Sequence, residues 1–145
     1  MRVGAVIVAA GRGVRAGGGT PKQWRPLGHA TSAEFALRAF AEHPSVSALV
    51  LVVHPDDRDA GLLPPTDACD VVTGGATRGA SVLAGLKQLE HKADAVLIHD
   101  AARPCVTPEI IDRVIAALKK TPAAAPCATR LMRKNSPSPN LPAMS

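Results

Sequence analysis

A buried strand that runs directly into a glycine-rich loop is the feature that most constrains this sequence. Residues 3–8 (Val-Gly-Ala-Val-Ile-Val) form an apolar run of strand length, and residues 9–23 follow as Ala-Ala-Gly-Arg-Gly-Val-Arg-Ala-Gly-Gly-Gly-Thr-Pro-Lys-Gln. Glycine has no Cβ, so its backbone can take positive φ and bring N–H groups close to an anion. Open α/β sheets bind ligands at the carboxyl ends of their strands. The place and composition of the loop therefore predict a phosphate site.

The charges of the loop favour this interpretation over its alternative, an ordinary flexible surface loop. The loop contains no acid, and its basic residues are Arg12, Arg15 and Lys22. Pro21 stiffens the chain directly before Lys22. A flexible linker has little use for a lysine that is placed so rigidly.

Two well-known phosphate loops do not fit the spacing. A P-loop requires Gly-x-x-x-x-Gly-Lys-Ser/Thr, whereas Lys22 follows a proline. A dinucleotide fingerprint requires Gly-x-Gly-x-x-Gly and an acid about 20 residues further on, at the end of the second strand. The glycines at 11, 13 and 17 are spaced one residue too widely, and Glu34 falls within a helical pattern. Nicotinamide binding is therefore only a weak alternative.

The remainder of the chain alternates between helical and strand patterns. Thr31 and Glu34 have the spacing of a capping box, and Thr107 followed by Pro108 is a typical helix start. Residues 58–68 are ambiguous, because they contain two adjacent prolines. The expected helices cover residues 31–43, 77–91 and 107–121, and the expected further strands cover residues 47–53, 70–73 and 93–98. This order predicts a Rossmann-like α/β fold, an open parallel sheet with helices on both faces.

Composition excludes several classes of function. The net charge is +5, but three of the 17 basic residues lie beyond residue 126, which leaves 14 against 12 acids. With so small an excess, and with only three aromatic residues in the chain, a nucleic-acid-binding surface is not expected. The three cysteines include no Cys-x-x-Cys pair, which favours a reducing cytoplasm. No apolar run is long enough to span a membrane.

Two further strand ends carry candidate site residues. The first, residues 74–81 (Gly-Gly-Ala-Thr-Arg-Gly-Ala-Ser), is either a ligand loop or an ordinary strand-to-helix turn with Thr77 as the N-cap. The second places Asp100 directly after a buried strand, where an acid is costly unless it is compensated. Asp100 suits Mg²⁺ bound to nucleotide phosphates, and the alternative is a structural ion pair with Arg103. His99 receives no role.

Together these motifs resemble the 2-C-methyl-D-erythritol 4-phosphate cytidylyltransferases of non-mevalonate isoprenoid biosynthesis. Ala-Ala-Gly-x-Gly-x-Arg, Pro-Lys-Gln, Ser-Val-Leu-Ala-Gly-Leu and His-Asp-Ala-Ala-Arg-Pro occur here in the order of that family. The resemblance covers about residues 3–126 and implies an enzyme that transfers CMP from CTP to a polyol phosphate. The ribitol phosphate cytidylyltransferases share much of the pattern and are the nearest alternative.

The resemblance implies catalytic and substrate-binding roles for four residues. Lys22 and Arg15 match the pair that stabilises charge on the α-phosphate as the substrate phosphate attacks and pyrophosphate leaves. Asp100 matches the acid linked to Mg²⁺, and Arg103 matches a contact to the polyol phosphate. Transfers of this kind are catalysed mainly by positioning and charge neutralisation, which agrees with a site built from cations and one carboxylate.

The same resemblance implies a nucleotide-binding set. The family holds the triphosphate at the first loop and the cytosine base at the loop before the second long helix. The corresponding residues are Ala9, Ala10, Gly11, Arg12 and Gly13 at the first loop, and Gly75, Ala76 and Ser81 at the second. Ala76 departs from the acid often found there, which matters little if its backbone makes the contact.

The C-terminal residues do not follow the family pattern. Residues 127–145 have no helix or strand period and contain three prolines, so they are expected to be a disordered tail after an incomplete domain over residues 1–126. Family members are homodimers and continue with an Asp-Thr motif and an arm that pairs two subunits. Neither is found here, which leads us to expect a truncated or frame-shifted chain, and an inactive nucleotide-binding fragment is the second hypothesis.

Overall fold

The computed structural model describes residues 1–11, 20–120 and 129–133, and for the last segment only the backbone. Helices and strands alternate along the chain as expected. The strands are β1 (Val3–Ala9), β2 (Pro26–Leu27), β3 (Ala30–Thr31), β4 (Val46–Val53), β5 (Asp70–Thr73), β6 (Ala95–Asp100) and β7 (Thr129–Arg133). The helices are the 3-10 turn η1 (Lys22–Trp24), α1 (Ser32–Ala41), α2 (Pro55–Asp59), α3 (Arg78–Gln88) and α4 (Pro108–Lys120).

The three long helices begin at the threonines that the sequence pattern indicated. The side-chain oxygen of Thr31 accepts a hydrogen bond from the Glu34 N–H at 3.2 Å, and that of Thr77 accepts from the Ala80 N–H at 3.1 Å. The Thr107 hydroxyl accepts from the Ile110 N–H at 3.3 Å, with Pro108 as the first helical residue. Each cap satisfies a backbone donor that the helix itself leaves free.

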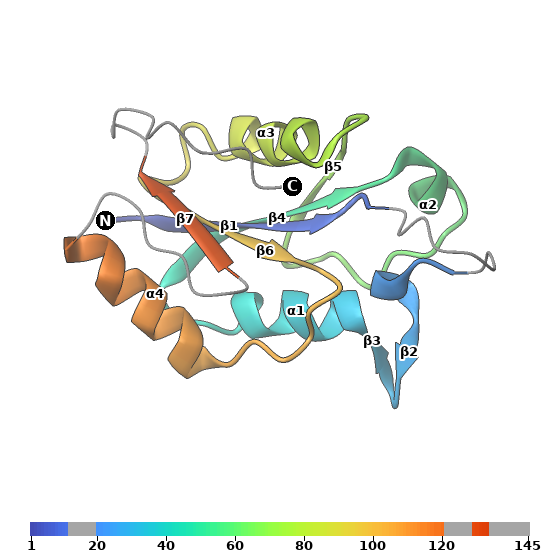
Figure 1. Cartoon of the computed structure of the whole chain (residues 1–145), viewed down its shortest axis with the longest axis horizontal. Coiled ribbons are helices and arrows are strands. Elements are labelled where there is room, and N and C mark those ends of the chain that lie inside the picture. Colours follow the sequence, from blue (N-terminus) through green and yellow to red (C-terminus); the bar gives the residue numbers. More distant parts are fainter. Residues whose placement is uncertain (12–19, 121–128, 134–145) are drawn as a thin grey trace.

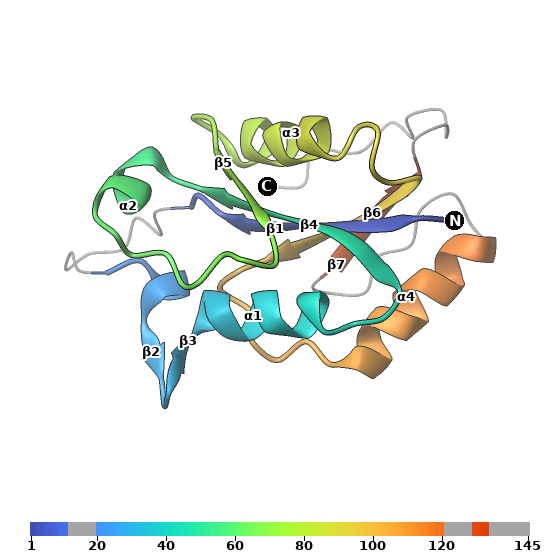
Figure 2. The same ribbon diagram turned by 180° about the vertical axis from the view of Figure 1, so that it is seen from behind.

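The five-stranded sheet has the order β5-β4-β1-β6-β7, with β1 at its centre. The pairs β5–β4, β4–β1 and β1–β6 are parallel, which confirms the predicted fold class. Alternate residues of each strand face opposite sides, so the sheet has two apolar layers. Figure 1 shows α1 and α4 on one side of the sheet and α3 on the other, and Figure 2 shows the same layers from behind.

Each layer has its own core. On the α1 and α4 side, Ile7, Leu51 and Leu97 pack beneath Phe40 of α1 and Leu118 of α4. On the α3 side, the core is built from shorter side chains, namely Val6, Val8, Val50, Val52, Val96 and Ile98 together with Leu89. A Cβ added to Gly85 of α3 would lie 2.5 Å from Cγ1 of Val6, so this glycine allows α3 to lie close to the sheet.

The backbone of residues 129–133 differs from the expectation of a disordered tail. These residues form β7, which pairs antiparallel with β6 from Ala95 opposite Arg133 to His99 opposite Thr129. The sheet is therefore mixed at this edge. A free edge of β6 would present unpaired N–H and C=O groups, and β7 pairs with these groups. The other tail residues, and the end of the expected domain near residue 126, lie outside the described residues.

Four short elements had no clear sequence signal. The turn η1 follows the glycine-rich loop, and β2 and β3 form a small hairpin next to α1, with Gly28 between them at φ +67°. The helix α2 lies directly after β4, where none of the expected helices was placed. Among the described helices, none is both long and apolar enough to cross a membrane.

Candidate nucleotide site at the carboxyl ends of the strands

The three loops singled out in the sequence start at neighbouring positions of the sheet. Ala9 at the end of β1 is level with Val53 of β4, which is level in turn with Thr73 at the end of β5. On the other side of β1, Val8 is level with Asp100 at the end of β6. Parallel strands lie about 5 Å apart, so all three loops lie at one edge of the sheet, around the end of β1 (Figure 1).

The first and second loops make direct contact through small residues. A Cβ added to Gly74 would overlap the Ser81 hydroxyl and lie 2.7 Å from the Cβ of Ala10. The Gly74 N–H donates to the Val53 carbonyl at 2.8 Å, which continues the sheet pairing one residue beyond β5. Ser81 is 2% exposed in the first turns of α3. Glycine at 74 therefore lets Ala10 and Ser81 approach each other across the site.

The turn before α3 is also compact. A Cβ added to Gly75 would lie 2.5 Å from the Cβ of Ala80, whereas Ala76 is exposed. Thr77 is the N-cap of α3, so this segment is the strand-to-helix turn that one of the two interpretations described. Cytosine contacts by Gly75, Ala76 and Ser81 remain a prediction.

The turn after β6 holds Asp100 and Arg103 through local hydrogen bonds. The Oδ1 atom of Asp100 accepts from the Ala102 N–H at 3.0 Å, and the Asp100 carbonyl accepts from the Arg103 N–H at 3.0 Å. The Ala101 carbonyl accepts from the buried Ser32 hydroxyl at 2.8 Å, which attaches the turn to α1. Among the described residues, no ion pair joins Asp100 to Arg103.

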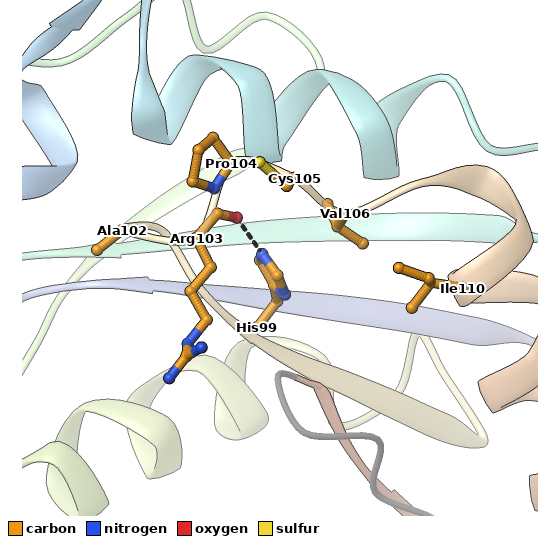
Figure 3. Close-up of a pocket in the computed structure, with 7 residues that line it drawn as sticks. All are labelled: His99, Ala102, Arg103, Pro104, Cys105, Val106 and Ile110. Carbon is orange, nitrogen blue, oxygen red and sulfur yellow. Dashed lines mark hydrogen bonds between the residues drawn. The ribbon is translucent and has the colours of Figure 1, made fainter.

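A cavity of about 330 Å³ lies beside this turn, lined by His99, Ala102, Arg103, Pro104, Cys105, Val106 and Ile110. Figure 3 shows the Arg103 side chain pointing away from Val106 and Ile110, which form the apolar end of the cavity. The His99 ring donates a hydrogen bond from Nε2 to the Arg103 carbonyl at 2.8 Å, the dashed line in Figure 3. Arg103 thus offers its charge at one end of a largely apolar cavity.

The lysine predicted to be catalytic is exposed on η1, directly after the glycine-rich loop. Its neighbour Gln23 is buried and donates from Nε2 to the carbonyls of Ala9 and Gly11, at 2.9 and 2.8 Å. The structure thus ties Lys22 to the end of β1. Gly11 has open space around its Cβ position, and of the described glycines only Gly28 and Gly61 have positive φ. Positive φ is therefore not the reason for glycine at position 11.

Part of the predicted set cannot be placed. Arg12, Gly13 and Arg15 lie outside the described residues. The structure brings together Ala9, Ala10, Gly11, Ser81 and Asp100 around the end of β1, with Lys22 held beside them through Gln23. The residues that sequence reasoning missed are Gln23, His99 and Ser32, whose side chains donate hydrogen bonds to backbone carbonyls at the starts of the loops. Gln23 and His99 did stand inside the family motifs, and that was their only signal.

Among the described residues, three side chains outside this cluster have shifted pKa values. Burial, and then the charge of Asp70, raises the pKa of the Cys69 thiol to about 11. Hydrogen bonds from Lys92 and Gln88 lower the pKa of Asp70, and a backbone hydrogen bond from Arg2 lowers that of Asp94. Asp94 precedes β6 and so lies at the opposite edge of the sheet from Asp100. These shifts belong to the packing of the fold and are not part of the site.

An open α/β sheet with three loops gathered around the end of its central strand is an arrangement that nucleotide-binding domains use. A family model described as IspD, 2-C-methyl-D-erythritol 4-phosphate cytidylyltransferase, matches residues 3–132. The chain belongs to this family. The match extends six residues beyond the limit at 126 that the motifs indicated, and reaches into β7.

Individual relatives agree with this assignment. A 2-C-methyl-D-erythritol 4-phosphate cytidylyltransferase from Roseobacter denitrificans is 62% identical over 126 residues, which are 87% of this chain and 57% of the relative. A bifunctional enzyme IspD/IspF from Bradyrhizobium sp. (strain ORS 278) is 55% identical over 135 residues, or 88% of this chain and 33% of the relative.

Among solved structures, the 2-C-methyl-D-erythritol 4-phosphate cytidylyltransferase of Thermus thermophilus superposes with a TM-score of 0.67 and 32% identity. The similarity covers 87% of this chain and 54% of that structure. This chain thus spans little more than half the length of the single-function relatives it matches, and a third of the bifunctional one.

Proposed function

We propose that this chain is a cytidylyltransferase that transfers CMP from CTP to 2-C-methyl-D-erythritol 4-phosphate, with the CDP-polyol and pyrophosphate as products. The observation that carries the proposal is the packing of Ala10, Gly74 and Ser81 against one another beside the end of β1, with Asp100 across the same strand. Family membership supports the same conclusion. The reaction belongs to non-mevalonate isoprenoid biosynthesis.

In this reaction an oxygen of the polyol phosphate attacks the α-phosphorus of CTP. One P–O bond forms, the bond from the α-phosphorus to the pyrophosphate oxygen breaks, and pyrophosphate leaves with the electron pair. We assign Lys22, together with Arg15, to neutralise the negative charge that builds up on the α-phosphate. Preorganised cations are effective here because they need no reorganisation at the moment of reaction.

The proposed nucleotide position uses the small residues of the site. Ala9, Ala10, Gly11, Arg12 and Gly13 would receive the triphosphate through backbone N–H groups and the Arg12 charge. Gly75, Ala76 and Ser81 would contact the cytosine base. Ser81 lies beside Gly74 and Ala10, and Ala76 is exposed at the turn before α3, so both segments border the space above the end of β1.

Asp100 fits a role as the protein's ligand to Mg²⁺ that arrives with the nucleotide. Its Oδ1 atom is used by the Ala102 N–H, and no ion pair with Arg103 competes for the carboxylate in the described part of the chain. The described residues contain no cluster of three or more His, Cys, Asp or Glu side chains for a metal. Mg²⁺ accepts such a sparse protein site because phosphates and water complete its octahedron. When bound, it would neutralise phosphate charge.

Arg103 is the proposed contact for the phosphate of the polyol. It borders the cavity beside the turn after β6, and its backbone is fixed by His99. A cation whose backbone is held in this way is suited to orient an attacking phosphate. We further propose a cytoplasmic location, which the free thiols of Cys69 and Cys105 support.

The experiment that tests the proposal is Mg²⁺-dependent pyrophosphate release from CTP and 2-C-methyl-D-erythritol 4-phosphate. It compares the wild-type chain with Lys22→Ala and with Lys119→Ala, an exposed lysine in the last turn of α4, as the control. We expect Lys22→Ala to lower kcat strongly with little change in the KM for CTP, and Lys119→Ala to behave as wild type.

Circular dichroism of both variants shows whether folding is retained. Equal losses in kcat and in CTP affinity on Lys22→Ala would exclude a role confined to the transition state. No release from the folded wild-type chain would leave the family assignment in place but make this polypeptide an inactive fragment of the enzyme. Release with ribitol phosphate in place of the methylerythritol substrate would favour the alternative polyol.

A further inference from the structure

We propose that Trp24 and Asp57 are positioning residues, which hold η1 and thereby set the place of Lys22 in the nucleotide site. This inference rests on the proposed function of Lys22. The indole Nε1 of Trp24 donates a hydrogen bond to Oδ2 of Asp57 at 3.0 Å. Both residues are buried, Trp24 at 4% and Asp57 at 2% exposed, although 33 positions separate them in the sequence.

The hydrogen bond joins two elements that follow neighbouring strands. Trp24 ends η1, which comes after β1 and the glycine-rich loop, and Asp57 lies in the first turn of α2, which begins two residues after β4. Strands β1 and β4 are paired along their whole length, up to Ala9 opposite Val53. The bond therefore fixes η1 to the helix that follows β4, the strand paired with β1.

Gln23 supplies the second attachment of the same turn. Its side-chain amide donates to the carbonyls of Ala9 and Gly11, so η1 is tied to the end of β1 on one side and to α2 on the other. Lys22 begins this three-residue turn and is not among its buried residues. Its own carbonyl accepts from the Arg25 N–H at 3.2 Å. The backbone of Lys22 is thus held in place while its side chain extends to the surface, where it can face a ligand.

Packing alone does not require a polar pair at this place. A buried carboxylate is costly unless hydrogen bonds compensate it, and two apolar side chains would fill the same volume without that cost. A hydrogen bond differs from apolar packing because it has direction, and here it fixes the orientation of the indole ring and of the turn that carries it. Reaction rates depend steeply on such placement, with about a hundredfold loss for a displacement of 1 Å.

The test compares variants that keep the shape of the pair and remove or retain the hydrogen bond. Asp57→Leu removes the acceptor, Asp57→Asn retains an acceptor oxygen, and Trp24→Phe removes the donor but keeps an aromatic ring. Asp59→Asn, an exposed acid on the same helix, is the matched control. Thermal unfolding of each variant identifies any that fail to fold.

Steady-state kinetics of pyrophosphate release give the first readout. We expect Asp57→Leu and Trp24→Phe to lower kcat at least tenfold with the KM for CTP within about twofold of wild type. Asp57→Asn should restore kcat to within about threefold, and Asp59→Asn should match wild type. Folded Asp57→Leu with wild-type kcat, or with kcat and KM changed in the same proportion, would overturn the positioning role.

The second readout needs no activity. Trp24 is the only tryptophan of the chain, so its ¹⁵N-labelled indole gives one side-chain signal in an NMR spectrum. This signal should be protected from solvent exchange in wild type and Asp57→Asn but exchange rapidly in Asp57→Leu, and the backbone amide signal of Lys22 should shift with it. If the wild-type chain releases no pyrophosphate, the proposed function fails, and the NMR measurement alone then tests the positioning role. An unchanged Lys22 amide signal in Asp57→Leu would contradict that role.

Discussion

The Nε2 atom of His99 lies 2.8 Å from the carbonyl oxygen of Arg103, so a buried imidazole holds the turn that carries Asp100 and Arg103. The His99 ring is 1% exposed and packs at 5.2 Å from the ring of Phe40 in α1. His99 and Asp100 are adjacent on β6, and their side chains leave the strand on opposite faces. The buried His99 side chain thus anchors the turn, and the half-buried Asp100 carboxylate is available to a ligand.

Replacing His99 should therefore weaken the polyol phosphate site more than the nucleotide site. His99→Leu leaves the Arg103 carbonyl without its partner, at a cost of about 1–3 kcal/mol in unfolding free energy. We expect a rise of about tenfold in the KM for the polyol phosphate and a change of less than threefold in the KM for CTP. Steady-state kinetics with each substrate varied in turn measure both, with His99→Gln as the variant that can still donate. An equal rise in both KM values would show a general loss of structure.

Asp100 and Asp94 flank the same strand and allow a matched comparison. Asp100 is the last residue of β6, at the end next to the candidate site, whereas Asp94 directly precedes the strand and pairs with Arg2 at 3.3 Å. Asp100→Asn keeps the shape but removes the charge that a divalent cation requires. We expect turnover to fall by about a hundredfold and the Mg²⁺ concentration for half-maximal activity to rise, with little change for Asp94→Asn. A magnesium titration of both variants distinguishes this from a structural role, in which the Mg²⁺ dependence would stay unchanged.

Alanine substitutions at Gly74 and Gly11 allow the effect of packing on stability to be measured separately from the effect of the backbone on CTP binding. An alanine at 74 would collide with Ser81 and with Ala10, and overpacking of this kind costs about 1–3 kcal/mol. The Cβ of an alanine at 11 would meet no atom of the described residues within 4 Å, so Gly11→Ala should leave the melting temperature unchanged. If the triphosphate approaches the backbone at position 11, Gly11→Ala should still weaken CTP binding. Calorimetric unfolding and CTP titration measure the two effects, and a large loss of stability in Gly11→Ala would contradict this account.

The raised pKa of the Cys69 thiol predicts that the free energy of unfolding depends on pH in the alkaline range. Burial and the charge of Asp70 raise its pKa to about 11 in the folded chain, from an ordinary value of 9.0. Above pH 9 the unfolded chain loses this proton first, so unfolding becomes more favourable as the pH rises toward 11. Urea unfolding at pH 8 and pH 10 should show a larger loss of stability for wild type than for Cys69→Ala. The same burial keeps the thiol protonated and slow to react with thiol reagents at pH 8, and identical pH profiles for both chains would exclude the effect.

The order and type of the main elements could be predicted from local patterns. Thr31, Thr77 and Thr107 mark three helix starts because an N-cap acts within one turn of its helix. The continuous apolar run of β4 indicates a central parallel strand, since such strands are covered on both faces. The three site loops followed from the rule that parallel strands present their carboxyl ends at one edge. Elements without a local signal, such as η1, α2 and β7, were not predicted.

The side chains that hold the site could not be predicted in this way. Gln23 reaches back to Ala9 across 14 positions, Trp24 meets Asp57 across 33, and Ser32 meets Ala101 across 69. Apart from the family motif that contains Gln23, nothing in the local sequence around these residues distinguishes them from other polar or aromatic positions. Similarly, glycine at 74 was attributed to a loop, and only the nearness of Ser81 and Ala10 shows that it provides room.

The sequence by itself determined the fold class, the edge of the sheet that carries the site and the family motifs at that edge, because apolar periodicity, helix caps and motif spacing act over short stretches of chain. The tertiary structure decided which residues support Lys22, Asp100 and Arg103, because buried hydrogen-bonding groups need partners and those partners come from whichever segments folding brings next to them. The supporting roles of Gln23 and of the Trp24–Asp57 pair became recognisable only through such non-local contacts, and that of His99 only once folding placed its ring against the Arg103 carbonyl.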